Sequence, residues 1–227
     1  MNPGRHIKTF FQGSAIYAWW LICLFGSAGQ LTWIRGWICT VLYLGGLHTA
    51  RAVLKKLNPG LLEQRETAIR KDTKPFDRIF LRVFLSLTIL QPIIAGLDMR
   101  FNGPSMPFLT VYPGIGLFTV AATLITWVLV KNPHAESSVR IQKDRGHTVV
   151  ASGPYRFVRH PMYVGLILLH ASMALILGSM WTLTLAALIA ILFLWRTALE
   201  DQTLRQELPG YEEYTTVTRY RLMPGIW

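Results

Sequence analysis

Residues 161–195 read PMYVGLILLHASMALILGSMWTLTLAALIAILFLW, without a single Asp, Glu, Lys or Arg. The stretch consists of two apolar runs on either side of Gly178-Ser179, a pair that favours a tight turn. An apolar run of about 20 residues can cross a bilayer as a helix. The stretch therefore predicts an antiparallel pair of membrane helices, over residues 161–177 and from Trp181 to near Leu208, where Pro209-Gly210 ends the second helix.

Four further apolar blocks precede this pair, at about residues 10–28, 33–54, 79–97 and 108–130. The chain of 227 residues is 52% apolar and 15% charged, and its mean hydropathy is +0.34. Pro92 lies inside the third block, where neighbouring helices can satisfy the carbonyl that it frees. We therefore predict a single all-α domain over residues 1–227, a polytopic bundle of about six transmembrane helices whose first helix is retained and is not cleaved as a signal peptide.

The basic residues lie between the apolar blocks and give the chain a net charge of +11. In a layout of six helices, every Lys and Arg except Arg35 and Arg100 lies on the side that holds both termini. Because Lys and Arg mark the cytoplasmic loops of membrane proteins, we expect both termini in the cytoplasm, in a multi-pass protein of the bacterial inner membrane. The charge does not indicate a nucleic-acid partner, and Cys23 and Cys39, both in apolar stretches, indicate neither a disulfide nor a metal site.

A dense polar segment begins the first helix of the pair. Residues 153–165 read GPYRFVRHPMYVG, with Arg, His and Tyr side chains crowded around Pro161. Pro is favoured at the first position of a helix, which places His160 at the helix boundary, where unsatisfied backbone N–H groups can receive an anionic ligand. The alternative is a loop at the membrane interface with snorkelling arginines and a tyrosine anchor.

Two charged residues lie where the last helix leaves the membrane. Arg196 and Glu200 are four positions apart and face the same way, so they form either a salt bridge within the helix or a polar pair that faces a cavity. Because the helix pair is antiparallel, this helix end must lie beside His160. The sequence therefore places one site at the cytoplasmic ends of the last two helices. A second polar segment, residues 58–78, is predicted to begin with a capped helix at Pro59 that lies on anionic headgroups.

Three patterns at these positions carry a family resemblance: residues 153–165, Arg196-x3-Glu200-Asp201-x2-Leu204, and Gly210-Tyr211-x2-Tyr214. Together they resemble the isoprenylcysteine carboxyl methyltransferase (ICMT) family, which forms a wider group with the membrane phospholipid N-methyltransferases. The resemblance covers about residues 140–227. It implies S-adenosyl-L-methionine as cofactor and S-adenosyl-L-homocysteine as product. It also implies variable N-terminal transmembrane helices over residues 1–130 and a cofactor-binding catalytic region over residues 131–227.

The resemblance also implies roles for individual residues. The cofactor pocket would be lined by Gln142, His147, Thr148, Val149, Val150, Gly153, Tyr155, Arg159, His160, Pro161, Met162, Tyr163 and Glu200. Arg196 would bind the methyl acceptor, and the catalytic residues would be Arg196, Glu200 and His160, without a metal. Glu200 would bind the ammonium or the ribose diol of the cofactor, and Arg159 would bind its carboxylate. The ring of Tyr155 or Tyr163 would face the sulfonium.

The expected acceptor is lipidic, because the site lies at the membrane boundary, where a substrate can enter between helices. The resemblance favours carboxyl O-methylation of an isoprenylcysteine-like substrate, in which Arg196 orients a carboxylate that needs no base. N-methylation of a membrane lipid amine is the alternative, and it would use Glu200 or His160 as the base. Membrane lipids are the other expected partners, and the sequence leaves the oligomeric state open.

Two other classes of protein compete with a methyltransferase. Membrane sterol reductases, which use NADPH, share the Arg-His-Pro-x-Tyr-x-Gly core found here at residues 159–165, and the ending RYRLMPG at residues 219–225 resembles theirs. The short chain and the helix that carries Arg196 and Glu200 favour the methyltransferase. A scaffold or a transporter would need polar groups at mid-membrane, where the few candidates are Arg82, Gln91 and His170.

Overall fold

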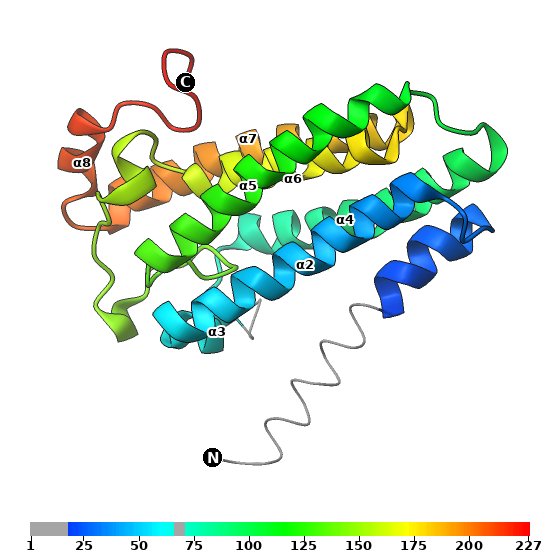
Figure 1. Cartoon of the computed structure of the whole chain (residues 1–227). Helices are drawn as coiled ribbons and strands as arrows, with labels where there is room; N and C mark the ends of the chain where they lie inside the picture. The colour runs from blue at the N-terminus through cyan, green and yellow to red at the C-terminus, as the bar shows by residue number, and fades with distance from the viewer. Residues whose placement is uncertain (1–17, 66–70) are drawn as a thin grey trace.

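The computed structural model describes residues 18–65 and 71–227, and this part of the chain forms helices and no strand. Long helices lie side by side in one bundle (Figure 1). The elements in chain order are η1 (Ile22–Gly26), α2 (Ile34–Leu57), α3 (Pro59–Arg65), α4 (Pro75–Phe101), η2 (Phe108–Thr110), α5 (Val111–Lys131), η3 (Lys143–Arg145), η4 (Gly153–Arg156), α6 (Pro161–Leu177), α7 (Met180–Glu207) and α8 (Tyr211–Val217).

Four helical segments are long and apolar enough to cross a membrane: Ile34–Leu57, Pro75–Phe101, Phe108–Lys131 and Met180–Glu207. The helix α6 is apolar but has 17 residues, a length of about 25 Å against a bilayer core of about 30 Å. The first expected helix begins outside the described residues, and its remainder is helical up to Ala28. The described structure is that of a polytopic integral membrane protein. The count of six helices and the side on which the termini lie stay predictions.

The helix α4 is longer than the sequence analysis expected. It begins at Pro75 and ends at Phe101, whereas the apolar block suggested residues 79–97. The charged residues Asp77 and Arg78 were assigned to the connector because they precede the apolar block. In the structure Asp77 is fully buried and pairs with a cation on α7, so the helix can include it.

The tight turn between α6 and α7 forms as predicted. Gly178 has a φ of 74°, a left-handed conformation that favours glycine, and the Ser179 hydroxyl accepts a hydrogen bond from the backbone N–H of Thr182. The buried guanidinium of Arg35, from α2, fills the space beside this turn, because a Cβ atom at Gly178 would lie 1.5 Å from Arg35 Nη1. The turn therefore fixes both the antiparallel pair and its contact with α2.

Two of the polar residues considered for a transport path satisfy each other inside the bundle. Gln91 Nε2 donates to the carbonyl of His170 at 3.0 Å, and His170 Nδ1 lies 2.6 Å from Gln91 Oε1. Both side chains are buried, and they join α4 to α6 next to Pro92. The third candidate, Arg82, is exposed on α4. Gln91 and His170 therefore form a hydrogen-bonded contact between helices, which removes the main support for a transporter.

One end of the bundle carries most of the irregular chain. The short helices α3 and α8 and the connector 132–160 gather there, where α6 begins and α7 ends (Figure 1). The helix α3 begins at Pro59 as predicted, and the Asn58 side chain caps it by accepting a hydrogen bond from the Leu61 N–H at 3.3 Å. We refer to this as the α8 end of the bundle.

Candidate active site

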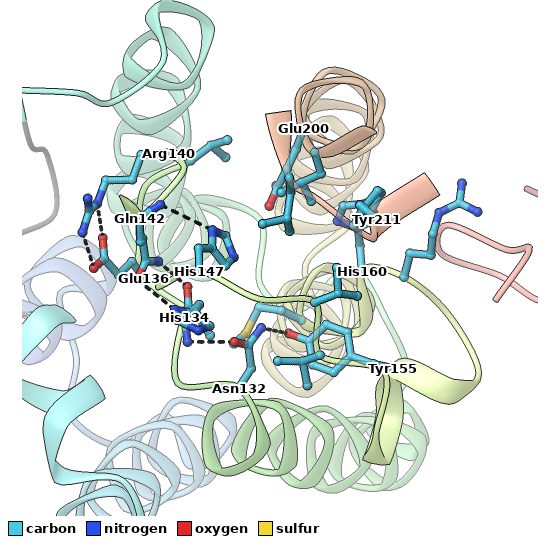
Figure 2. Close-up of a pocket in the computed structure, with 18 of the residues that line it drawn as sticks. Asn132, His134, Glu136, Arg140, Gln142, His147, Tyr155, His160, Glu200 and Tyr211 are labelled. Carbon is cyan, nitrogen blue, oxygen red and sulfur yellow. Dashed lines mark hydrogen bonds and ion pairs between the residues drawn. The ribbon is translucent and has the colours of Figure 1, made fainter. Parts of the chain in front are cut away.

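The start of α6 and the end of α7 lie together at the α8 end, as the antiparallel pair predicts. The Tyr163 hydroxyl donates a hydrogen bond to the Glu200 carboxylate, and His160 Nε2 lies 3.4 Å from Asp201 Oδ1. The connector 132–160 and α8 enclose a pocket against these two helix ends (Figure 2). The polar segment before α6 and the charged end of α7 therefore form one site.

Most of the predicted site residues line this pocket, namely Gln142, His147, Thr148, Val149, Val150, Tyr155, Arg159, His160, Met162, Tyr163, Arg196 and Glu200. Two predicted residues, Gly153 and Pro161, are not part of its lining. Gly153 begins η4 with a φ of 63°, and a Cβ atom there would lie 3.1 Å from Lys131 Cγ. Pro161 is the first residue of α6. These two residues shape the chain around the pocket.

A cluster of charges around Asp201 forms one side of the site. Asp201 is fully buried on α7, and Arg159 binds both of its oxygens, with Nε 2.8 Å from Oδ1 and Nη2 3.2 Å from Oδ2. The same carboxylate also contacts Tyr211, Arg205 and Arg221. A bidentate arginine pair of this kind is both strong and directional. Asp201 therefore ties the start of α6, α8 and the C-terminal residues to α7.

This cluster alters the role expected for Arg159. Its Nη1 donates to the carbonyls of Thr218 and Arg219, at 3.0 and 2.8 Å, in addition to the two bonds with Asp201. Arg159 is 5% exposed, and it is part of the pocket lining as well as of this network. The geometry favours a structural task for Arg159, while binding of the cofactor carboxylate stays a prediction.

The ion pair of Arg196 is with Asp77 on α4 and not with Glu200. Arg196 Nε lies 2.9 Å from Asp77 Oδ1, and its Nη2 donates to the carbonyl of Ser137 at 3.0 Å. The guanidinium also lies over two aromatic rings, 4.2 and 5.1 Å from the centroids of Phe80 and Tyr163. The salt bridge within the helix that the sequence allowed is therefore replaced by one between helices, which holds the cation at the pocket.

Gln142 braces the wall of the pocket that lies opposite Glu200 (Figure 2). Its Nε2 donates to the carbonyl of His134 at 2.7 Å, and its Oε1 accepts from Arg145 at 3.0 Å. Its backbone N–H donates to His147 Nδ1 at 3.4 Å. Burial, together with the nearby His134, lowers the pKa of His147 to about 4. The His147 ring is therefore neutral at pH 7, with its proton on Nε2.

Arg140 stabilises the same wall through hydrogen bonds with acidic side chains. It binds both oxygens of Glu136, at 2.8 and 3.0 Å, and its Nη1 reaches Asp144 at 2.8 Å and Asp72 at 3.0 Å. The hydrogen bonds with Glu136 and Asp144 raise the pKa of Arg140. These bonds close the chain from 136 to 144 into a loop and fasten it to the segment that precedes α4.

Tyrosines from the connector and α8 supply aromatic surface to the pocket. The Tyr155 hydroxyl accepts a hydrogen bond from Asn132 Nδ2 at 2.7 Å, and the Tyr155 carbonyl accepts one from the Tyr214 hydroxyl at 2.6 Å. Burial raises the pKa of Tyr155, and it raises the pKa of Tyr214 to about 12. Both phenols are therefore neutral, and their rings can face a cation.

Glu200 and Ser138 offer polar groups to a ligand in the pocket. Glu200 is partly exposed in the lining, next to Tyr163. The Ser138 hydroxyl is buried and has no hydrogen-bond partner within the described part of the chain. A buried polar group without a partner is costly, so an unpaired hydroxyl in a pocket lining favours a polar ligand there.

Several residues of the site were not predicted from the sequence: Asp77 beside the pocket and, in its lining, Asn132, His134, Glu136, Ser138, Arg140, Tyr211 and Tyr214. Tyr211 and Tyr214 had a signal, because they stand in one of the three patterns that carry the resemblance. Asp77 had a weaker signal, as the acid nearest to the apolar block in a basic connector. The connector residues had none, because an irregular loop has no periodicity to read.

The pocket lies within a segment that matches a known family. Residues 114–206 match the model of the isoprenylcysteine carboxyl methyltransferase (ICMT) family, a segment from α5 to the end of α7 that is less than half of the chain. For this segment, the match confirms the resemblance predicted from the sequence. No curated protein matches the chain in sequence.

Proposed function

We propose that the pocket binds S-adenosyl-L-methionine and that the protein methylates the carboxylate of a lipidic, isoprenylcysteine-like acceptor. The observation that carries this proposal is the position of Glu200. Its carboxylate lines the pocket opposite a neutral wall, formed by His147 and Gln142, within the segment that matches the ICMT family (Figure 2). An ammonium group or a ribose diol is the ligand group that such a carboxylate binds well.

The lining fits the other parts of this cofactor. Tyr155 and Tyr163 offer neutral aromatic rings for a sulfonium. The unpaired Ser138 hydroxyl and the His147 Nε2–H supply neutral hydrogen-bonding groups for an adenine or a carboxylate. We therefore assign the binding of the cofactor to these residues together with Glu200, and we assign to Gln142 and Arg140 the support of the loop that carries them.

Methyl transfer to a carboxylate mainly requires the protein to align the acceptor oxygen with the methyl group. When bound, S-adenosyl-L-methionine would supply an activated methyl group: its bond to sulfur would break, leaving the electron pair on sulfur, as a bond to the acceptor oxygen formed. A carboxylate acceptor brings its own negative charge, so no residue has to remove a proton. The described residues mainly position the reactants, which can account for much of the rate. The aromatic and aliphatic lining excludes water from a step that neutralises charge.

Arg196 and His160 are each held in place by a buried acid. Asp77 holds the Arg196 guanidinium at the pocket edge, and Asp201 lies beside His160 Nε2 and keeps that ring in place. A lipid amine acceptor would instead need a base at the methyl acceptor. Glu200 could serve as that base, and a methylated amine product would support this second function.

The α8 end is proposed to face the cytoplasm. The two basic residues that the layout assigns to the other side, Arg35 and Arg100, lie on α2 and α4 at the opposite end from the pocket. Most other Lys and Arg residues of the described chain lie in the connectors, in the short helices or near the helix ends at the α8 end. A cysteine introduced next to α8 should react with a membrane-impermeant thiol reagent only after the cytoplasmic side is opened.

The binding of S-adenosyl-L-homocysteine tests the proposal directly. We expect the purified protein in detergent to bind it by calorimetry, and we expect Glu200→Gln to weaken the affinity at least about tenfold, since one charge-assisted contact is worth 1.5–3 kcal/mol. Wild-type protein should also transfer labelled methyl to N-acetyl-S-farnesylcysteine. Stabilisation against heat by NADPH, without any by S-adenosyl-L-homocysteine, would overturn the assignment in favour of a reductase.

A further inference from the structure

The chain that follows α8 turns back and lies against the side of the bundle (Figure 1). We refer to residues 218–227 as the return loop. The backbone N–H groups of Arg159 and His160 donate hydrogen bonds to the carbonyls of Tyr220 and Arg221, each at 2.9 Å. The return loop is therefore joined directly to the two residues that precede α6.

The return loop is closed by its own contacts. The Trp227 carbonyl accepts hydrogen bonds from the N–H groups of Arg221 and Leu222, at 2.9 and 3.2 Å. The Arg221 guanidinium lies 4.9 Å from the centroid of the Trp227 ring, and its Nε lies 3.0 Å from Asp201 Oδ2. Gly225 supplies the turn, with a φ of 82°. These contacts determine which side chains of the loop point inward and which point outward.

The outward side chains of the return loop are apolar or cationic. Met223 and Ile226 are 55% and 75% exposed. Arg219 and Tyr220 are exposed as well, and no Asp or Glu occurs between residues 214 and 227. Exposed apolar side chains together with Tyr, Trp and Arg are typical of segments that lie in the interface between membrane and water. The composition of the loop therefore favours a lipid surface as its partner.

The inward side chains place the return loop at the level of the membrane surface. Leu222 is buried in a hydrophobic cluster with Ile189 and Phe193 of α7, and Trp227 packs against the same cluster. The apolar run of α7 ends two residues after Phe193, and Arg196 is the first charged residue that follows. The loop therefore lies beside the point at which α7 leaves the hydrocarbon core, where an outward apolar side chain can enter the leaflet.

We propose that the return loop is an interfacial anchor whose partner is a bilayer that contains anionic phospholipid. Met223 and Ile226 insert among the acyl chains of the leaflet at the α8 end, and Arg219 binds the phosphates of anionic headgroups. The Arg219 guanidinium is available for this contact, because it forms no hydrogen bond or ion pair within the described part of the chain, where only its carbonyl is bonded to Arg159. This inference does not depend on the proposed methyl transfer. Through the bonds to Arg159 and His160, the anchor attaches the start of α6 to the membrane surface beside the pocket.

Spin labelling of the full chain tests the insertion, in vesicles of equal parts phosphatidylcholine and phosphatidylglycerol. We expect a label at Ile226→Cys, with Cys23 and Cys39 replaced by Ala, to be more accessible to molecular oxygen, which dissolves in lipid, than to a water-soluble nickel chelate. A label at Glu213→Cys, an exposed position on α8, is the control and should show the opposite order. A label at residue 226 that the nickel chelate reaches as easily as it reaches residue 213 overturns the inference.

The same label distinguishes lipid from a protein partner. If a second copy of the chain covered the return loop, labels at Ile226→Cys would broaden one another's spectra and be shielded from both reagents, which would overturn the inference. Met223→Asp should move the label at residue 226 toward water, whereas Thr216→Asp, at an exposed position on α8, should leave it in place. Circular dichroism should show that every variant keeps the helix content of the wild type.

The contribution of Arg219 is tested by the choice of lipid. With a fluorophore in place of the spin label at Ile226→Cys, spin-labelled phosphatidylglycerol should quench about fivefold more effectively than spin-labelled phosphatidylcholine, since one cation near the surface gives about that preference. Arg219→Gln should remove the difference. Lys143→Gln, which removes an exposed charge from η3 at the same end of the bundle, should leave the difference unchanged. Equal quenching by the two lipids in a chain that keeps Arg219 overturns the inference.

Discussion

The buried pair between Asp77 and Arg196 gives a prediction whose size follows from the contacts. Asp77 is fully buried on α4, where it pairs with Arg196 and accepts a hydrogen bond from the Val139 N–H at 2.6 Å. Asp77→Ala leaves a guanidinium that is 6% exposed without its counter-charge. Breaking a buried pair from one side costs about 3–5 kcal/mol of the free energy of unfolding. Arg196→Met leaves the carboxylate unpaired and should cost a similar amount.

The double variant separates pairing from packing. With both charges removed, the remaining cost is chiefly the unsatisfied Val139 N–H, about 1–3 kcal/mol. We therefore expect Asp77→Ala with Arg196→Met to be less destabilised than either single variant. The measurement is denaturant unfolding in detergent micelles, followed by circular dichroism. A double variant whose cost equals the sum of the two single costs would refute the reasoning, because independent sites add.

An exposed pair on the same two helix ends provides the control. Lys74 Nζ lies 2.6 Å from Glu207 Oε1, and these side chains are 28% and 42% exposed. Solvent screens such a pair, so Glu207→Ala should cost no more than about 1 kcal/mol. If Glu207→Ala cost as much stability as Asp77→Ala, burial would not explain the contribution of the Asp77–Arg196 pair.

Two further predictions concern the turn before α7 and the pocket wall. Gly178→Ala should destabilise the protein more than Gly103→Ala, because both glycines have positive φ, of 74° and 71°, but only a Cβ at Gly178 collides with a buried guanidinium; thermal unfolding of the two variants gives the comparison. For His147, the folded pKa of about 4 lies below the unfolded value of about 6.5. The unfolded chain therefore binds the extra proton between these values, so stability is lost as the pH falls from about 6.5 to 4. Unfolding as a function of pH should show this slope in wild type and a shallower slope in His147→Gln.

Local signals made the α6–α7 pair predictable. The two apolar runs, Pro161 at the first helical position and Gly178-Ser179 between the runs are all read from neighbouring residues, and α6 begins and ends at the predicted residues. The meeting of His160 with the end of α7 followed from that geometry alone. Side chains within a few residues of a turn are placed by the turn, so this half of the site could be predicted.

Pairings between distant elements could not be predicted in this way. The partner of Arg196 is 119 positions away along the chain at Asp77, and nothing in the spacing on α7 distinguishes it from Glu200. Arg159 was expected to bind the cofactor carboxylate because of the family resemblance, and the sequence alone does not show its partner. Its partner became evident only when α7 and the C-terminal residues were seen to fold over it. Which ion-pair partner a charged side chain takes on another helix depends on how the helices pack, and a single sequence does not show that packing.

The adjacent acids Glu200 and Asp201 show why packing decides function here. Successive residues on a helix point about 100° apart, and here the two neighbouring carboxylates have different surroundings. Asp201 points into the arginine cluster, and Glu200 points into the pocket beside Tyr163. If Glu200 and Asp201 had the same role, one carboxylate would be enough, and replacing either residue would have little effect. Instead, loss of Asp201 should loosen α8 and the start of α6, whereas loss of Glu200 should leave the fold intact and remove the charge that the pocket offers to a ligand.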